Sequence, residues 1–502
     1  MFRLLSLTIL HHRVLGNTHF DFYQAREHNQ YPEEIYTSVI IGANGIGKSH
    51  LMRAIADIFS YLEALTTEMV EVKTIPAFKF LVKYQVGVAE YEFANIREWE
   101  PVGGRNRMQN THLYKRNGEE VRAGQMALPT RIIASTMTVT DKFTTVPGGR
   151  YIYKGIRNER SPNTTGTRTM IRKTVSGLLR SLDIKEGFRQ ELAELLERMD
   201  LRPRLEVSYT LRYKDVFLKR EMTPELLCRI FDHQEEYFEH RHSQIWGTAN
   251  FQRLRQDEGK LSIVARFLRN LAEANVDVKR VTLNYSVLED PQRINRDREA
   301  LEALSSLDLL SFPSLRIYKR DTDFAFENSS SGETHLLCQL IGIMSDIEHE
   351  SLVLIDEPEN SAHPSWQVNY IGWLKDVFNH YGDSHFVIAT HSHFLLTDLK
   401  PETSDIIALV RGVDNNLKDD SDGVNTFNWS VDDILYRVFG VRNTRNRAFE
   451  EDIMQLYKLL SEGSQDIGTI NTLRTRLARY ELPGNDPLKE IINQARRYVE
   501  NR

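Results

Sequence analysis

A glycine-rich loop near the start of the chain carries the residue types that hold a nucleotide phosphate. The loop, GANGIGKS, runs from Gly42 to Ser49 and follows a short apolar β-branched run, which predicts a buried strand. Glycines let the backbone aim N–H groups at phosphate oxygens, while the lysine and serine reach phosphate and Mg²⁺. The loop therefore predicts an ATP·Mg²⁺ site formed by Gly42, Asn44, Gly45, Gly47, Lys48 and Ser49.

Two later apolar runs end in polar residues suited to phosphate chemistry. The first ends in Asp356 and Glu357, and the second ends just before His391, 35 residues after Asp356. Asp356 is predicted to hold the Mg²⁺ together with Ser49. Glu357 is the candidate that orients or deprotonates the attacking water. His391 is the candidate that contacts the γ-phosphate and responds to its loss.

A serine-rich string, SSSGE, occupies residues 329–333, shortly before the run that ends in Asp356. It precedes a predicted helix over 334–344, whose dipole at its start favours an anion. Ser330, Ser331 and Gly332 are therefore candidate phosphate donors. A serine-rich stretch is also an ordinary helix cap, so the string alone leaves both interpretations open.

Taken in this order and spacing, the strings resemble the ABC class of ATPases, and within it the soluble branch with RecF-like, SMC-like and OLD-like proteins. In that class the signature of one subunit closes over the γ-phosphate held by the phosphate loop of another. The resemblance implies that Ser330, Ser331 and Gly332 act on the ATP of a second copy. A homodimer, or a higher even-numbered homo-oligomer, is the implied assembly. The usual glutamine between the lobes has no counterpart, and Asp141 is the candidate for its role.

The resemblance also implies an α/β fold: an ABC-type ATPase head with a mixed-sheet core and an antiparallel β layer, a helical insertion and a helical C-terminal region. A two-strand entry over 1–22, an alternating stretch over 80–93 and the turn signal Asn117-Gly118 predict the antiparallel layer. The expected domains are a first ATPase lobe with the phosphate loop, a helical insertion, a second lobe with signature, Walker B motif and switch histidine, and a C-terminal helical region. Their expected bounds are 1–175, 176–300, 301–410 and 411–502.

Composition places few restrictions on function. The chain has 502 residues, of which 41% are hydrophobic and 27% charged, as in ordinary soluble globular proteins. Two distant cysteines without metal spacing suit a reducing cytoplasm, where we expect the protein to work. No run of 18 apolar residues occurs, so we expect no membrane span and no membrane partner.

One segment departs from the overall net charge of −6. Between Lys142 and Arg180 the chain has nine basic residues and one acidic residue, Glu159. This surplus predicts a nucleic-acid contact. A partner surface, a loop that contacts the nucleotide and a solvated helix face remain alternatives.

Two strings near the C-terminus, at 438–440 and 486–488, resemble the ATPase components of two-gene bacterial anti-phage systems such as Septu. This resemblance implies a hydrolysing ATPase that controls a separately encoded effector, either a nuclease or a toxin. A RecF-like DNA-maintenance ATPase that binds DNA directly is one alternative. A non-hydrolysing scaffold that dimerises around ATP is the other.

Overall fold

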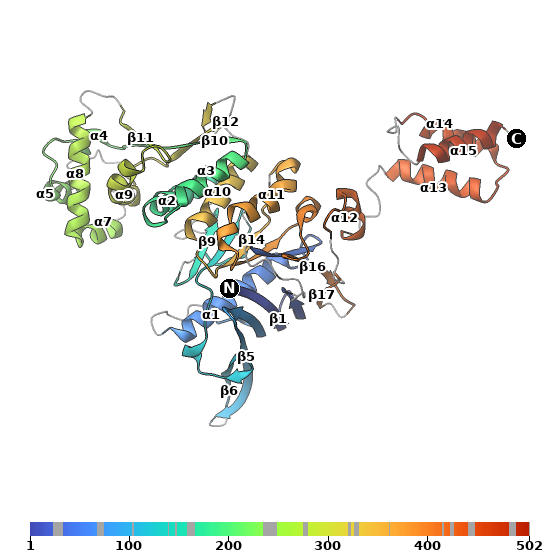
Figure 1. The fold of residues 1–502 in the computed structure, drawn as a ribbon, viewed down its shortest axis with the longest axis horizontal. Coiled ribbons are helices and arrows are strands. Elements are labelled where there is room, and N and C mark those ends of the chain that lie inside the picture. Colours follow the sequence, from blue (N-terminus) through green and yellow to red (C-terminus); the bar gives the residue numbers. More distant parts are fainter. Residues whose placement is uncertain are drawn as a thin grey trace. The chain divides into compact units, whose positions relative to one another are not determined.

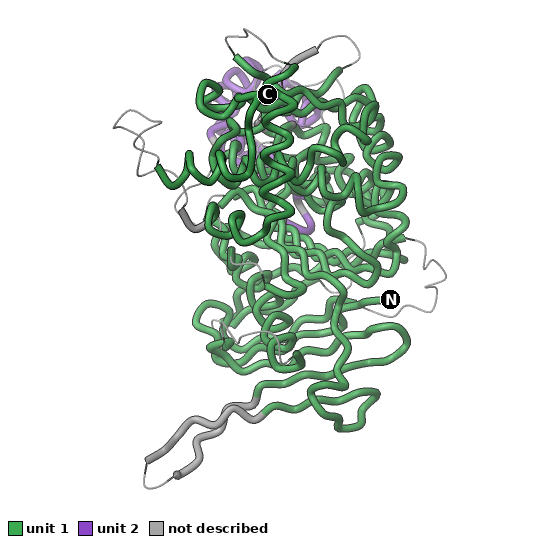
Figure 2. The backbone as a smooth tube through the Cα atoms, turned by 90° about the vertical axis from the view of Figure 1, so that its left-hand side faces the viewer, with its two compact units in different colours: residues 1–434 green, residues 435–502 purple. Residues whose placement is uncertain are grey.

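The computed structural model describes most of the chain and divides it into two compact units, residues 1–434 and 435–502 (Figure 2). The described residues are 1–23, 34–67, 75–102, 105–138, 140–145, 148–157, 166–233, 248–274, 280–319, 323–325, 331–360, 362–413, 416–421, 426–439, 447–480 and 488–500.

A seven-stranded sheet with the order β17-β16-β3-β15-β14-β8-β9 forms the centre of the first unit (Figure 1). Only β17 is antiparallel to its neighbour. Every residue of β8, β14 and β15 is buried, which explains why these strands read as continuous apolar runs. The bounds are β3 (Tyr36–Gly42), β8 (Ile132–Thr136), β9 (Tyr151–Gly155), β14 (Leu352–Asp356), β15 (His385–Ala389), β16 (Ser404–Arg411) and β17 (Leu417–Asp419).

The register of this sheet aligns the carboxyl ends of its three middle strands. Asp356 at the end of β14 pairs with Ala389 at the end of β15, and Ala389 pairs with Ile40 of β3. Loops that leave parallel strands at the same edge must lie side by side, and this edge is where α/β proteins bind ligands. The register thus brings the phosphate loop, the acidic pair and the histidine loop to one place.

The first unit also contains an antiparallel six-stranded sheet with the order β2-β1-β4-β5-β6-β7. This confirms the predicted antiparallel layer and its two-strand entry. Asn117 and Gly118 both have positive φ, as a two-residue hairpin turn requires. The bounds are β1 (Phe2–His12), β2 (Gly16–Asp21), β4 (Lys79–Val86), β5 (Ala89–Val102), β6 (Arg105–Arg116) and β7 (Glu119–Glu120).

Helix α1 (Lys48–Thr66) shares one hydrophobic core with the central and the antiparallel sheet. Phe59 of this helix packs edge-on against Phe2 of β1 and Tyr84 of β4. Other helices of the unit are α2 (Thr167–Ile184), α10 (Ser331–Asp346) and α11 (Pro364–Val377), with short 3₁₀ helices η1 (Ala123–Gln125), η3 (Asn379–Tyr381) and η4 (His393–Asp398). Because α1 begins in the phosphate loop, this core also fixes the position of the loop.

The segment between the two lobes contains strands as well as the expected helices. Strands β10 (Leu201–Thr210) and β11 (Thr282–Ser286) join β12 (Ser314–Lys319) and β13 (Asp323–Ala325) in a sheet with the order β11-β10-β12-β13. Leu205, Val207 and Tyr209 are buried and alternate with less buried residues, so β10 carried a strand pattern that the sequence analysis did not use. The helices here are α3 (Phe188–Arg198), α4 (Lys214–Phe217), α5 (Pro224–Asp232), α7 (Thr248–Arg255), α8 (Glu258–Ala274) and α9 (Pro291–Ser306).

The second unit is a small helical body with its own core. It contains α13 (Arg447–Ser461), α14 (Ile467–Leu477) and α15 (Leu488–Glu500), while α12 (Val431–Arg437) spans the division between the units. Leu456, Ile470, Leu473 and Ala495 are buried against one another. No helix among the described residues is both long and apolar enough to cross a membrane.

Because the two units have separate cores, we expect a destabilising substitution in the second unit to leave the stability of the first unit unchanged. We expect Leu456→Ala, at a fully buried position of α13, to destabilise α13–α15 by about 2–5 kcal/mol through a lost side chain and a cavity. Hydrogen exchange should accelerate over 447–500 and stay unchanged in β3. Met454→Ala is the control, because Met454 lies on the same helix and is 62% exposed. Equal loss of protection in β3 would contradict the division into two cores.

Candidate active site

The loop between β3 and α1 has the backbone conformation that its glycines permit. Gly42 has a φ of 151° and Gly47 a φ of 130°, a region that other residues rarely adopt. A Cβ atom at Gly42 would lie 2.8 Å from the Leu409 carbonyl oxygen of the neighbouring strand. The loop therefore turns tightly against β16 and leads directly into α1, whose first-turn N–H groups face the carboxyl edge of the sheet.

Lys48 is buried at the start of α1 and points back across the loop. Its Nζ donates to the Gly42 carbonyl oxygen (2.8 Å) and lies 3.0 Å from Nδ1 of His391. Burial lowers the pKa of Lys48 to about 8, and the nearby carboxylates of Glu357, Glu359 and Asp356 oppose that shift. A polyanion bound at the loop would add to the charge that favours the protonated lysine.

Asp356 lies at the end of β14 with a fully buried carboxylate. Burial raises its pKa to about 7, and the adjacent Ser49 hydroxyl opposes that shift. Within the described part of the chain, neither carboxylate oxygen has a hydrogen-bond partner of good geometry. A buried carboxylate without partners is costly, and a divalent cation held with a hydroxyl relieves this cost. Ser49 and Asp356 therefore fit a Mg²⁺ ion at this position.

Glu357 and His391 form a short chain of polar contacts that leads to Lys48. Nε2 of His391 lies 3.3 Å from Oε1 of Glu357, while its Nδ1 faces Lys48. These partners assign the ring proton to Nε2, because Nδ1 must accept from the lysine. The contact with His391 holds the pKa of Glu357 below its usual range, so this residue stays ionised. Glu357 also has a φ of 52°, a strained conformation that its N–H, bonded to the Ala389 carbonyl, helps to hold.

Glu359, which was not predicted from the sequence, positions the histidine loop. Its Oε1 accepts hydrogen bonds from the backbone N–H groups of His391 (2.6 Å) and Ser392 (3.1 Å). The Ser392 hydroxyl in turn donates to Oε1 of Gln367 on α11 (2.6 Å). Burial raises the pKa of Glu359. A third carboxylate so close to Asp356 was the available sequence signal, but its partners lie in the loop after β15, about 30 residues later in the chain.

Comparisons with known proteins place similar sequences in part of this chain. Residues 176–397 match a family described as "AAA domain, putative AbiEii toxin, Type IV TA system". That match contains Gly332, Asp356, Glu357 and His391 but not the phosphate loop. The chain resembles a P-loop ATPase of the ABC class. It is also 27% identical over 161 residues to Septu protein PtuA from Bacillus thuringiensis, which covers 28% of this chain and 38% of PtuA. The match thus spans well under half the length of PtuA.

Two solved SMC heads also align with the chain. The Smc head domain of Pyrococcus furiosus, with an extended coiled coil and bound to the C-terminal domain of ScpA, is 11% identical. Its alignment covers 83% of this chain and 96% of that one, with a TM-score of 0.31. The SMC head domain from Thermotoga maritima is 13% identical and covers 82% and 95% of the two chains, with a TM-score of 0.32.

The serine-rich signature at residues 329–333 lies only partly within the described structure. Ser329 and Ser330 lie outside the described residues. Ser331 begins α10, one turn earlier than the predicted helix, and Gly332 is buried in the first turn. Asn44 is exposed in the phosphate loop. Of the predicted site residues, the structure brings five together at one edge of the central sheet: Lys48, Ser49, Asp356, Glu357 and His391.

Asp141 is held by contacts within its own region. Its carboxylate accepts from Arg157 Nε (2.8 Å) and the Tyr153 hydroxyl (2.9 Å), and also from the Phe143 N–H (3.0 Å). These bonds tie the loop after β8 to β9. A role of Asp141 in place of the usual glutamine stays a prediction.

Several basic residues between Lys142 and Arg180 form ion pairs with carboxylates of the same chain. Arg157 pairs with Asp141, and both Lys154 and Arg180 pair with Asp346 at the end of α10. Three of the predicted cations therefore share two internal carboxylates. Arg160 lies outside the described residues.

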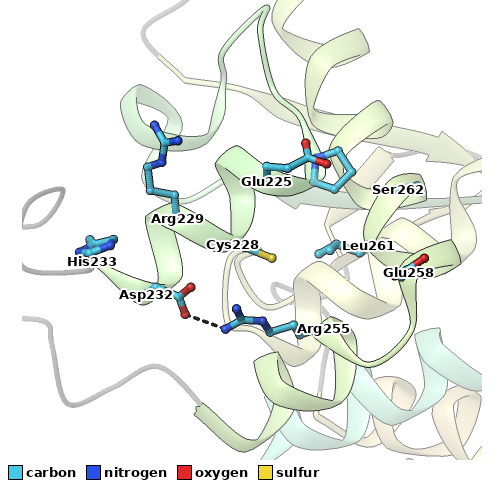
Figure 3. Close-up of a pocket in the computed structure, with 10 residues that line it drawn as sticks. Glu225, Cys228, Arg229, Asp232, His233, Arg255, Glu258, Leu261 and Ser262 are labelled. Atoms are coloured by element: carbon cyan, nitrogen blue, oxygen red, sulfur yellow. Dashed lines mark hydrogen bonds and ion pairs between the residues drawn. The ribbon is translucent and has the colours of Figure 1, made fainter.

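A separate cavity of about 630 Å³ lies between α5, α7 and α8 (Figure 3). Asp232 pairs with Arg255 across it (3.0 Å), and Glu225 and Glu258 add negative charge. Its lining contains no residue of the candidate active site. Within the described part of the chain, no group of three or more histidines, cysteines and acids is arranged to hold a metal ion.

The contacts of Glu359 predict a measurable effect on the histidine loop. Glu359→Ala leaves the His391 N–H without its acceptor, and we expect hydrogen exchange at this amide to accelerate by about tenfold. Glu359→Gln is the matched control, because it keeps an acceptor oxygen at the same reach. Unchanged exchange in the alanine variant would remove Glu359 from this positioning role.

Proposed function

We propose that the chain binds ATP·Mg²⁺ and hydrolyses it, that ATP joins two copies, and that the joined pair controls a separately encoded effector. The observation that carries this proposal is the convergence of Lys48, Asp356, Glu357 and His391 at three adjacent strand ends. Ligand-binding residues of α/β proteins gather at such an edge.

The binding half of the proposal rests on the phosphate loop. Loop N–H groups and the start of α1 offer donors to the phosphates, and Lys48 adds a cation. Ser49 and Asp356 would hold the Mg²⁺. When bound, Mg²⁺ neutralises charge on the phosphate oxygens during transfer.

The hydrolytic half rests on Glu357. Its ionised carboxylate is 29% exposed at the edge of the site, where it can accept a proton from water. His391 holds the carboxylate from one side and contacts Lys48 on the other. A γ-phosphate bound by Lys48 therefore changes the partners of His391, which couples occupancy of the site to the water-activating group.

The dimer rests on the signature and its helix. Ser331 and Gly332 begin α10, and we propose that they and Ser330 cap the γ-phosphate held by a second copy. Because these donors contact ATP only in the closed pair, ATP favours closure and its hydrolysis removes that preference.

The effector rests on the similarity to PtuA and to the family described with a putative AbiEii toxin. We propose a nuclease or toxin as the effector, anti-phage defence as the process and the cytoplasm as the place. The two cysteines, Cys228 and Cys338, are unpaired, in line with a reducing compartment. A RecF-like role in which this chain tracks DNA directly is less well supported, because Lys154 and Arg157 are paired internally.

The first test concerns binding. Lys48→Ala removes the cation at the phosphate loop, and we expect ATP affinity to fall by about 10- to 100-fold, the value of a charged hydrogen bond. Isothermal titration calorimetry measures this. Lys79→Ala, at the start of β4, is the control for loss of one positive charge. Unchanged ATP affinity in Lys48→Ala would count against the site.

The second test separates hydrolysis from scaffolding. Glu357→Gln keeps the size of the side chain but cannot accept the proton, so we expect phosphate release to fall by about 100-fold or more while ATP stays bound. Light scattering should then find a persistent ATP-dependent dimer. Glu402→Gln, an exposed site on the same unit, is the control. Full turnover in Glu357→Gln would reject Glu357 as the water-activating residue, and an ATPase-inactive parent chain would favour the scaffold.

A further inference from the structure

A polar cavity of about 680 Å³ lies at the junction of the signature helix with the inserted sheet and helices. Its walls come from β9, α2, α9 and the end of α10, and α2 packs beside both α9 and α10 (Figure 1). The volume is within the range of small-molecule sites. It shares no lining residue with the phosphate loop or with the strand ends that form the candidate active site.

The cavity has a surplus of positive charge. Five cationic side chains line it against two carboxylates, Asp346 and Glu302. Asp183 pairs with Arg298 from outside the lining, and counting it still leaves a surplus of two. The cationic residues are Lys154, Arg172, Lys173, Arg180 and Arg298. Cations gathered in a concave, partly dry site favour a multivalent anion.

The individual contacts leave donors available. A single carboxylate, Asp346, serves both Lys154 and Arg180, and the Arg180 side chain remains 48% exposed. Arg172 makes no ion pair within the described part of the chain, and its guanidinium lies over the Phe312 ring at 5.8 Å. Nε of Arg298 is buried and has no acceptor among the described residues. Both Nη atoms of Arg298 are already paired, with Asp183 and Glu302. Arg172 and the exposed part of Arg180 therefore supply the donors that a ligand can reach.

The cations of α2 share one face of the helix. Arg172, Ser176 and Arg180 recur at every fourth position, and Gly177 lies against Ser345 of α10, where a Cβ would be 3.0 Å from Oγ. The close approach at Gly177 holds the two helices together beside the cavity. The site is thus built into the packing of α2 on α10.

We infer that this cavity binds a phosphate-bearing small molecule, with Arg172 and Arg180 as its main ligands. Guanidinium groups form paired hydrogen bonds with phosphate oxygens, and a phosphate carries enough charge to offset the surplus. A singly charged carboxylate would leave half of that surplus uncompensated. A concave site of this size suits a compact ligand better than a nucleic-acid strand, which tracks along an open groove.

The test uses the full chain carrying Lys48→Ala, so that binding at the phosphate loop is weakened, and inorganic tripolyphosphate as the probe. Ser176→Glu adds a carboxylate at the exposed rim of the cavity, and Ser176→Gln adds the same bulk without charge. We expect one tripolyphosphate per chain by calorimetry. Its affinity should fall by about tenfold or more in Ser176→Glu and should change little in Ser176→Gln.

A second variant guards against an indirect effect of position 176. Arg172→Gln combined with Arg180→Gln removes two cations while Lys154 still pairs with Asp346, and it should also weaken binding by about tenfold or more. Arg266→Gln, on the exposed face of α8, is the charge control. Thermal melting of each variant verifies that it is folded.

Binding measurements with two other ligands, ADP and a single-stranded oligonucleotide, distinguish the source of the phosphate. ADP bound with the same sensitivity to Ser176→Glu supports the site and includes nucleotides among its ligands. Absence of tripolyphosphate binding, or equal binding by Ser176→Glu and Ser176→Gln, overturns the inference. A single-stranded oligonucleotide that alone binds with this sensitivity also overturns it, since the cavity would then belong to a nucleic-acid surface.

Discussion

The structure depends on the parallel, in-register pairing of β3, β15 and β14. This pairing sets Ile40, Ala389 and Asp356 level with one another, so the three loops that follow must share one edge. In that register the buried backbone N–H and C=O groups of these strands pair with one another, and a shift of one residue would turn every apolar side chain to the opposite face. This register brings together the loops that carry Lys48, Glu357 and His391. The polar contacts between these three side chains then fix their positions relative to one another.

A second constraint links the signature helix to the rest of the protein. Helix α2 is bonded along α10: the Ser181 hydroxyl donates to the Ser345 carbonyl (2.8 Å), and Lys185 Nζ donates to the Met344 carbonyl (2.9 Å). Lys154 of the edge strand β9 and Arg180 of α2 also meet on Asp346. Movement of α10 is therefore shared by α2 and by the elements packed on it. Under the proposed function, closure on ATP would reach the inserted sheet and the polar cavity through these contacts.

The sequence predicted the parts of the site whose chemistry is local. The glycines before Lys48 and the carboxylates after an apolar strand are readable because a phosphate loop and a strand end each lie in a few consecutive residues. Glu359 was missed because its partners, the N–H groups of His391 and Ser392, come from another strand. The internal pairing of Lys154 and Arg180 with Asp346 was equally invisible, and a count of basic residues overstated the charge available to nucleic acid. Strand β10 was overlooked because its neighbours in the chain are helical.

The central claim is that each chain supplies half of a working site, with the phosphate loop of one copy completed by the signature of another. Mixing two inactive variants tests it most directly: Lys48→Ala, which lacks the phosphate grip, and Ser331→Arg, which blocks the signature. A mixed pair contains one site with an intact loop and an intact signature. The account predicts that phosphate release, negligible in each variant alone, returns in the mixture at a rate that rises with the fraction of mixed pairs. Full activity of Ser331→Arg alone, or a mixture as inactive as its components, would contradict it.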